Sequence, residues 1–288
     1  MKRFILPILF LCASYLQAQF ENTDVGARPS ALAGAFTSIS DNSLAVFYNP
    51  SGLGQMEYRE FAVYYSPAPY GLTDLSTAAV SYAEPTKFGT IGAAFKTYGF
   101  DLYRENNFMV SYGSSYKNRI FYGANLNLYN LHIQNYNNAT AFGIDIGALA
   151  YIAKSLQFGF FGKNITGTKI GESKEKIAQV YRTGLMYQPE DFLRIAAEAE
   201  KDVRYPLSIR GGIEYNVIEF IDLRFGVGSE PTLFSAGVGI NYNMFSFDYG
   251  FTKSEDLGFT HLGTVSFNFG GAKGRKESRE RLKKAFGN

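Results

Sequence analysis

The sequence predicts an all-β fold, a transmembrane antiparallel β-barrel of about fourteen strands with an N-terminal plug segment inside its lumen. Three observations favour this fold class. Phenylalanine, tyrosine and glycine number 26, 21 and 30 among 288 residues, and tryptophan is absent. Segments of alternating apolar and polar residues recur over residues 59–269. No run after Ala18 reaches the roughly 18 uninterrupted apolar residues that a membrane-spanning helix requires.

The alternation identifies the strands and the surroundings of their two faces. In FSFDYGFT (residues 245–252) every second residue is aromatic, and Ser, Asp, Gly and Thr lie between. This period of two indicates a strand with unlike faces, which a soluble sandwich would share. The length of about ten residues favours a tilted bilayer crossing, and the small polar residues of the second face suit a lumen. Tyrosines also lie at strand ends on the apolar face, where interfacial aromatic residues belong: Tyr65, Tyr82, Tyr112, Tyr187, Tyr215 and Tyr242.

The pattern predicts fourteen strands, an even number, as single-chain bacterial barrels have. They span residues 59–66, 74–83, 88–98, 105–115, 119–131, 140–152, 155–164, 178–188, 192–201, 207–216, 220–228, 233–242, 245–253 and 260–269. Connections after even-numbered strands are short, and those after odd-numbered strands tend to be longer, above all residues 165–177. Short turns are typical of the periplasmic end. We therefore expect the cell outer membrane as the location and both termini in the periplasm.

The chain divides into four predicted regions. Residues 1–18 have a basic start and an apolar core and end at a cleavage site, which predicts a secretory signal peptide. Cys12, the only cysteine, lies within it, so we expect the processed chain to have neither disulfides nor cysteine–metal sites. Residues 19–57 are the predicted plug, residues 58–270 the barrel and residues 271–288 a basic tail.

Residues 26–56 of the predicted plug read GARPSALAGAFTSISDNSLAVFYNPSGLGQM. This segment is too polar for a membrane helix and too irregular for a strand. A fourteen-stranded barrel is wide enough to leak unless something fills it. Small side chains would let the segment approach the wall closely, above all at Gly34, and Asn49-Pro50 with Ser51-Gly52 supplies a turn that leads into the first strand. We therefore expect the segment to fold back into the lumen.

Three motifs of this segment, GAR, ALAGAF and SDNSLAVFYNPSGL, followed by a barrel-like remainder, resemble the N-terminal signature of FadL-type outer-membrane proteins. The matching residues are Gly26, Ala27, Arg28, Gly34, Ala35, Phe36, Asp41, Asn49, Pro50, Gly52 and Leu53. The resemblance implies passive transport of small apolar or amphipathic molecules, which displace or slip past the plug and leave sideways through the wall into the lipid. The superfamily also includes the PorV/PorQ proteins, so the alternative is a protein-interaction component of type IX secretion.

Charged side chains on the lumen side form the candidate site. The alternation places these residues inward: Lys96, Asp145, Lys163, Arg182, Arg194, Glu198, Glu200, Arg210, Glu214, Asp222, Arg224 and Asp248. They could hold a polar solute or the plug, but isolated charges are costly to desolvate, so we expect pairing across strands. Arg28 and Asp41 of the plug are the expected partners of this lining. The apolar plug residues Leu44, Val46 and Phe47 are expected to serve packing rather than a ligand pocket.

No catalytic residue, metal site or cofactor is expected. His132 and His261 are the only histidines, and neither lies near a nucleophile motif, a phosphate-binding loop or metal-ligand spacing. The expected partners are outer-membrane lipid and an apolar small-molecule ligand. The tail, with seven lysines and arginines against two glutamates over residues 273–284, would also suit a periplasmic or secretion-system protein. Nucleic acid is not expected in this compartment.

Overall fold

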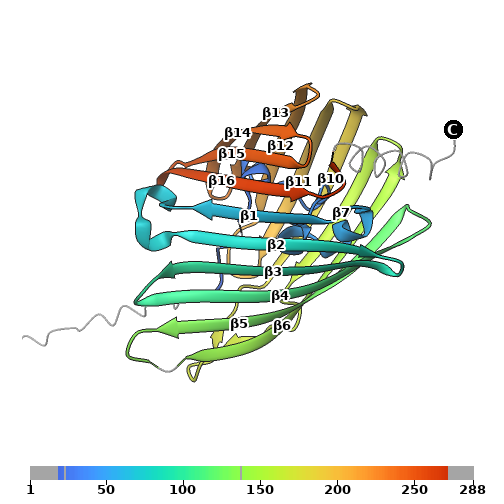
Figure 1. Ribbon diagram of the computed structural model, residues 1–288. Coiled ribbons are helices and arrows are strands. Elements are labelled where there is room, and N and C mark those ends of the chain that lie inside the picture. Colours follow the sequence, from blue (N-terminus) through green and yellow to red (C-terminus); the bar gives the residue numbers. More distant parts are fainter. Residues whose placement is uncertain (1–18, 23, 137, 272–288) are drawn as a thin grey trace, which may run out of the picture.

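Fourteen strands form one closed antiparallel barrel, in which β1 pairs with β16 to complete the ring (Figure 1). The computed structural model describes residues 19–22, 24–136 and 138–271, so the predicted signal peptide and nearly all of the predicted tail lie outside the described residues. The strands are β1 (Glu60–Ser66), β2 (Thr77–Thr86), β3 (Gly89–Phe100), β4 (Tyr103–Tyr116), β5 (Ile120–Ile133), β6 (Ala139–Ala153), β7 (Leu156–Lys163), β10 (Val180–Glu190), β11 (Leu193–Asp202), β12 (Ser208–Ile218), β13 (Ile221–Ser229), β14 (Thr232–Tyr242), β15 (Phe245–Ser254) and β16 (Gly258–Asn268). The short strands β8 (Lys169–Ile170) and β9 (Glu175–Lys176) form a separate hairpin between β7 and β10.

The predicted number of strands is confirmed, and each predicted strand overlaps one strand of the barrel. The largest shift is in β2, which begins at Thr77 rather than at residue 74. Two 3-10 turns, η2 (Pro69–Gly71) and η3 (Thr73–Leu75), occupy the preceding residues. Residues 73–75 form a 3-10 turn, in which the N–H of Ser76 donates to the carbonyl of Thr73 at 3.0 Å, so sheet pairing begins only after it.

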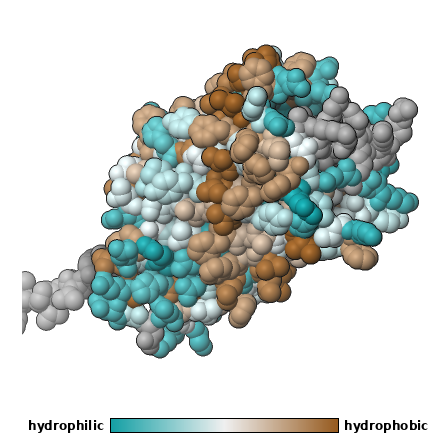
Figure 2. All heavy atoms as spheres, in the orientation of Figure 1, coloured by the Kyte–Doolittle hydropathy of each residue, from teal (hydrophilic) through white to brown (hydrophobic). Residues whose placement is uncertain are grey.

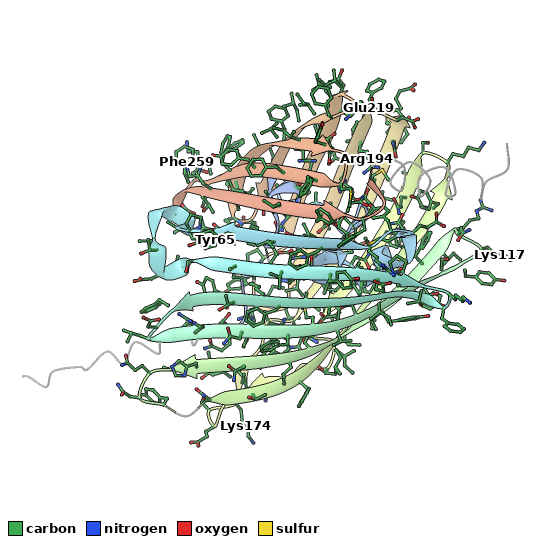
Figure 3. The ribbon with its side chains drawn as sticks, in the orientation of Figure 1. Tyr65, Lys117, Lys174, Arg194, Glu219 and Phe259 are labelled. Carbon is green, nitrogen blue, oxygen red and sulfur yellow. The ribbon has the colours of Figure 1, made fainter. Side chains whose placement is uncertain are left out.

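The two ends of the barrel differ in their connections. At the tight-turn end, where β1 begins and β16 ends, six turns of two or three residues join the strands. At the opposite loop end most connections are longer, up to residues 164–179, although residues 101–102, 230–231 and 255–257 are as short as the turns. Lys117 lies in a turn of the tight-turn end and Lys174 in the longest connection of the loop end (Figure 3). The predicted asymmetry is therefore present, with three exceptions.

The outward face of the strands carries an apolar belt. On β1 the exposed Phe61, Val63 and Tyr65 alternate with the buried Ala62 and Tyr64. Figure 2 shows the apolar residues gathered in a band across the strands, with hydrophilic surface on both sides of it. An exposed apolar band around a closed barrel is typical of a lipid-facing surface. Among the described residues, no helix is long and apolar enough to cross a membrane.

The belt leads to a depth-dependent expectation for arginine substitutions. Val238 lies in the middle of β14 and pairs with Tyr249 of β15, whereas Tyr242 is the last residue of β14. Val238→Arg should destabilise the barrel by roughly 2–4 kcal/mol, because it places a charge near the bilayer midplane, and Tyr242→Arg by roughly 0–1 kcal/mol near the interface. Refolding into lipid vesicles across a urea series measures both. An equal loss of unfolding free energy in the two variants would contradict a belt that has Val238 near the bilayer midplane and Tyr242 near the interface.

The N-terminal segment (residues 19–57) runs along the inside of the barrel (Figure 1). Two short α-helices, α1 (Ala27–Ala31) and α2 (Ala45–Tyr48), and the 3-10 helix η1 (Pro50–Gln55) are joined by irregular chain. From residue 25 to residue 56, every residue except Arg28, Asp41 and Asn42 is buried. The helices contact different parts of the wall: α1 packs on β13–β16 and η1 on β3–β6. The segment thus touches opposite sides of the ring.

Gln19, the first described residue, lies at the loop end, whereas the chain ends that the expectation of periplasmic termini concerns lie outside the described residues. Its N–H donates to the carbonyl of Lys176 at 3.2 Å, and its carbonyl accepts from the N–H of Ala178 at 3.1 Å. These partners belong to the connection at the loop end, whereas β16 finishes at the tight-turn end. The even strand count places only the start of β1 and the end of β16 together, because residues 19–57 pass along the lumen before β1 begins.

Candidate functional site

The N-terminal segment fills the lumen with a packed apolar centre. The rings of Phe36 and Tyr48 meet edge to face with centroids 5.4 Å apart, and both residues are fully buried. Leu44, Val46 and Phe47 belong to the same cluster, together with alanine, methionine and leucine side chains of the wall. The packing expected of these three residues is present, and Val46 and Phe47 also line a small cavity described below.

Small residues allow the segment to touch the wall. A Cβ on Gly54 would lie 2.6 Å from the backbone oxygen of Ser114 in β4. A Cβ on Gly34 would lie 2.4 Å from Nη1 of Arg210 in β12, and the backbone of Gly34 has a φ of +80°, which favours glycine. The collision expected at Gly34 is therefore with a wall side chain rather than with wall backbone.

Gly26 and Gly52, the other two glycines of the predicted plug motif, are enclosed by the segment itself. A Cβ on Gly52 would lie 1.9 Å from the carbonyl oxygen of Ser40, and one on Gly26 would lie 2.5 Å from Cδ1 of Leu44. Both positions are thus required by the internal folding of the segment. Gly26 also has a φ of +97° directly before α1.

Asn49 joins the segment to the wall and begins η1. Its Nδ2 donates to the carbonyl of Thr37 at 2.9 Å and to the carbonyl of Ala148 in β6 at 3.1 Å. Its Oδ1 accepts from the N–H of Ser51 at 3.2 Å and from the Ser51 hydroxyl at 2.6 Å. Pro50 occupies the first position of the helix, where its missing N–H is not needed. The turn predicted at Asn49-Pro50 is therefore the beginning of a 3-10 helix, with Asn49 as its N-cap and Pro50 as its first residue.

Arg28 and Asp41 pair with the lumen lining, as predicted. Arg28 Nε lies 2.7 Å from Glu214 Oε2, and Arg28 Nη1 lies 2.6 Å from Asp41 Oδ1. Arg194 Nη1 lies 2.8 Å from Asp41 Oδ2 (Arg194 is labelled in Figure 3). Burial alone would raise the pKa of Asp41, but the guanidiniums of Arg28 and Arg194 hold the pKa of this carboxyl well below its usual value.

The ion-pair network continues along the wall from Glu214. Arg224 Nε lies 2.8 Å from Glu214 Oε2, and its two terminal nitrogens lie 2.6 Å from Asp248 and 3.1 Å from Asp222. Glu214 also lies 3.3 Å from Arg194. Three arginines and four carboxylates are therefore held together, which compensates charges that would be costly if buried alone.

A second charged group holds the middle of the segment. Glu200 accepts from Arg182 at 2.5 Å and from Arg210 at 2.6 Å. Glu198 accepts the backbone N–H of Thr37 at 2.9 Å. The guanidinium of Arg182 also lies 5.4 Å from the ring centre of Tyr48. Wall side chains thus satisfy a backbone that has no sheet partner of its own.

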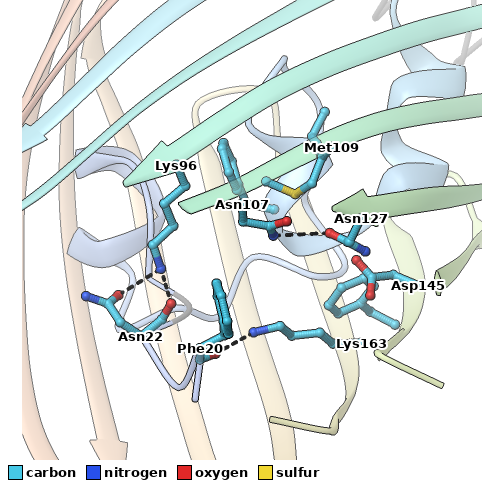
Figure 4. A pocket seen from close by; sticks show the side chains of 11 residues that line it. Phe20, Asn22, Lys96, Asn107, Met109, Asn127, Asp145 and Lys163 are labelled. Carbon is cyan, nitrogen blue, oxygen red and sulfur yellow. Dashed lines mark hydrogen bonds between the residues drawn. The ribbon is translucent and has the colours of Figure 1, made fainter. Parts of the chain in front are cut away.

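The lysines of the opposite wall hold the start of the segment. Lys96 donates to the carbonyl of Asn22, and Lys163 Nζ lies 2.8 Å from the carbonyl oxygen of Phe20 (Figure 4). Beside them is a cavity of about 40 Å³. A buried water needs roughly 10–15 Å³ by this measure, so the cavity has room for about three waters. Its lining is Phe20, Asn22, Val46, Phe47, Lys96, Asn107, Met109, Asn127, Asp145, Phe161 and Lys163.

All twelve charges that the alternation places inward are buried or half-buried. The sequence interpretation missed the neutral and acidic partners of the segment. Glu60 accepts from the N–H and hydroxyl of Ser43 at 2.9 and 2.8 Å, and Asn125 Nδ2 donates to the carbonyl of Val46 at 2.9 Å. The same alternation places Glu60 and Asn125 inward. Asn125 was missed because only charged residues were considered, and Glu60 because it precedes the apolar run of β1.

The histidines do not lie together. His132 Nδ1 is 2.6 Å from Asn138 Oδ1 near the loop end, and His261 Nδ1 is 2.7 Å from the Tyr249 hydroxyl on the outer face. In the part of the chain that the structure describes, no three His, Cys, Asp or Glu side chains are grouped to hold a metal ion.

No protein-family model matches the sequence, and no curated protein matches it. Solved structures do match the fold. The chain is similar to the CymD monoaromatic hydrocarbon channel, with a TM-score of 0.65 and 10% identity over 86% of this chain and 98% of that one. It is similar to a Pseudomonas aeruginosa FadL homologue, with a TM-score of 0.62 and 11% identity over 85% of this chain and 98% of that one. It is also similar to the P. putida toluene transporter TodX, with a TM-score of 0.61 and 11% identity over 84% of this chain and 96% of that one.

At this level of identity the likeness concerns the fold. The chain has the fold of the FadL-type outer-membrane barrels, as the motifs of its N-terminal segment predict. None of the structures named here is a type IX secretion protein, so the alternative interpretation gains no support from them.

Proposed function

We propose that this protein is an outer-membrane channel for passive passage of small apolar or amphipathic molecules, with residues 19–57 as its plug. The filled lumen carries this proposal. Almost every residue from 25 to 56 is buried against the wall, which leaves no room around the segment for the wide aqueous path of a general porin. Apart from the two backbone hydrogen bonds of Gln19, side chains make the hydrogen bonds and ion pairs that hold the segment, so it can move while the wall keeps its backbone hydrogen bonds.

An interruption in the wall supports a sideways route. Strand β7 is much shorter than β6, and their pairing stops at Ile146 and Gly162, so residues 139–145 of β6 have no partner in β7. The connection of residues 164–179 covers them instead. It donates three hydrogen bonds to β6. The N–H of Ile165 donates to the carbonyl of Ile144 at 2.9 Å, the hydroxyl of Thr168 to the carbonyl of Phe142 at 2.7 Å, and the N–H of Asn164 to Asp145 at 2.7 Å. Few hydrogen bonds hold this part of the wall, so it can open at less cost than a full strand pair.

The surroundings of this interruption are apolar on both sides. Phe142, Ile144 and Ile165 are exposed on the outside. On the inside lies an apolar cluster that includes Ala141 of β6 and Ile170 of β8. An apolar solute at this interruption would therefore meet apolar side chains on both faces of the wall, with the Asp145 carboxylate beside them bonded to the N–H of Asn164 at 2.7 Å. The monoaromatic hydrocarbon channel CymD and the toluene transporter TodX, which have the same fold, support this solute class.

A disulfide across the interruption tests the route. In proteoliposomes, wild type should speed toluene entry, and the variant Ile144→Cys/Ile165→Cys should lose most of that activity when oxidised and regain it on reduction. A backbone hydrogen bond joins Ile144 and Ile165, so the two residues are close enough for a disulfide. The pair Val63→Cys/Val80→Cys is the matched control, since these exposed partners lie in a fully paired part of the wall.

Two results would count against the proposal. Equal toluene entry with and without the protein would contradict transport itself. Unchanged entry through the oxidised Ile144–Ile165 variant, with transport intact, would contradict the sideways route alone.

A further inference from the structure

Charged side chains of the wall bind the backbone of Phe20 on both sides. Its backbone N–H donates to Glu105 Oε1 at 2.8 Å, and its carbonyl accepts from Lys163 Nζ at 2.8 Å (Figure 4 shows the lysine contact). Glu105 also accepts from the hydroxyl of Tyr103 at 2.6 Å, which orients the carboxylate. An acidic group therefore meets the nitrogen and a basic group meets the carbonyl of one residue.

The side chain of Phe20 has its own apolar pocket. The ring lies 4.8 Å from the ring of Tyr129 between centroids, tilted by 59°. The rest of the pocket consists of Leu131, Ala141, Ile170 and Ile177, and Phe20 is only 5% exposed. This is an aromatic subsite built by β5, β6 and the 164–179 connection.

The backbone of Phe20 is held in an unfavourable conformation. Its φ is +62°, a region that bulky residues rarely adopt and that persists only where the surroundings impose it. The contacts to Glu105, Lys163 and the aromatic pocket therefore hold this residue against its local preference. A free ligand with the same groups would bind there without that backbone strain.

The adjoining cavity contains polar atoms without a partner. Asn107 Oδ1 and Asn127 Nδ2 are buried and have no hydrogen-bond partner, although the two side chains bond each other through their other atoms at 3.2 Å. Both residues line the cavity beside Phe20 and Lys163. One acceptor and one donor thus remain free for water or for the polar part of a ligand.

We propose that Phe20 is an internal pseudoligand, and that the site it occupies takes a free aromatic amino acid when the start of the segment withdraws. The ring enters the pocket of Tyr129, the ammonium group binds Glu105 and the carboxylate binds Lys163. This inference rests on the proposed function, since it names one amphipathic class among the solutes of the channel. The arrangement distinguishes such a zwitterion from a hydrocarbon, which would leave Lys163 without the acceptor that Phe20 supplies and Glu105 with only the Tyr103 hydroxyl.

Binding to the Phe20→Ala variant tests the inference. This variant removes the ring that anchors the start of the segment, so residues 19–22 can withdraw and leave the ring pocket, Glu105 and Lys163 free for a ligand. Calorimetry in detergent should show L-phenylalanine binding about tenfold or more tighter than 3-phenylpropionate, which lacks the ammonium, or phenethylamine, which lacks the carboxylate, because hydrogen bonds to buried charges are the strong ones. Toluene should be weakest. In the same background Glu105→Gln should remove the advantage over 3-phenylpropionate, and Lys163→Met the advantage over phenethylamine.

A second measurement leaves Phe20 in place. In a Glu21→Cys variant, a water-soluble maleimide should label the new thiol faster in the presence of L-phenylalanine and no faster with toluene, because only the amino acid displaces residues 19–22. The inference is overturned if toluene or 3-phenylpropionate binds Phe20→Ala as tightly as L-phenylalanine, or if L-phenylalanine neither binds the variant nor changes the labelling. Toluene transport that persists in that case would leave the proposed function intact.

Discussion

Deleting residues 31–44 should convert a nearly closed barrel into an open one. The deletion removes the end of α1, Asp41 and the stretch whose backbone is bound by Glu198 and Ser235. The wall should survive, because its strands close through their own hydrogen bonds. In planar bilayers we expect single-channel conductance to rise about tenfold or more, since the lumen of a fourteen-stranded ring is wide once it is emptied.

Two glycine substitutions distinguish a loosened N-terminal segment from a general destabilisation of the barrel. Gly34 and Gly71 both have a φ of +80°, but a Cβ at Gly34 meets Arg210 whereas the space around Gly71 is open. Gly34→Leu should therefore raise the conductance, and Gly71→Leu, with the same backbone strain, should leave it unchanged. If the deletion variant and wild type conduct equally little, wall side chains already fill the lumen and the segment is not the seal.

The strands could be predicted from the sequence because each has one face toward lipid and one toward the lumen. In β15, aromatic residues alternate with Ser246, Asp248 and Gly250, and this alone fixes the period and the facing. The same alternation placed twelve charges inward. It could not say which charges pair, since Arg28 and Glu214 are 186 residues apart and meet only through the closure of the ring.

The course of the first described residues was beyond sequence reasoning. Residues 19–22 have no periodicity, and their position depends on distant side chains such as Lys96 and Glu105. The motif resemblance begins only at Gly26, so it carries no information about them. The wall interruption was equally invisible. A predicted strand over residues 155–164 says nothing about how far its neighbour β6 extends beyond it.

Glu214→Gln should have the largest effect of any single substitution in the charged network. Glu214 accepts two hydrogen bonds from Arg28, at 2.7 and 2.9 Å, one from Arg194 at 3.3 Å and one from Arg224 at 2.8 Å. The amide keeps the shape but removes the negative charge that these three buried guanidiniums share. Removing one partner of a buried ion pair costs roughly 3–5 kcal/mol, because the remaining charges stay desolvated and uncompensated. Refolding in urea with vesicles measures this loss.

The substitution should also loosen the seal, because Arg28 is the residue of α1 that ties the helix to β12. We therefore expect higher conductance together with lower stability. Glu84→Gln is the matched control: Glu84 lies 2.8 Å from Arg59, the same kind of contact, but the arginine is 61% exposed and water can replace the lost partner. That variant should be unchanged in both measurements. Wild-type stability in Glu214→Gln would mean that Asp41, Asp222 and Asp248 suffice to compensate the three arginines, and that the network does not hold the segment in place.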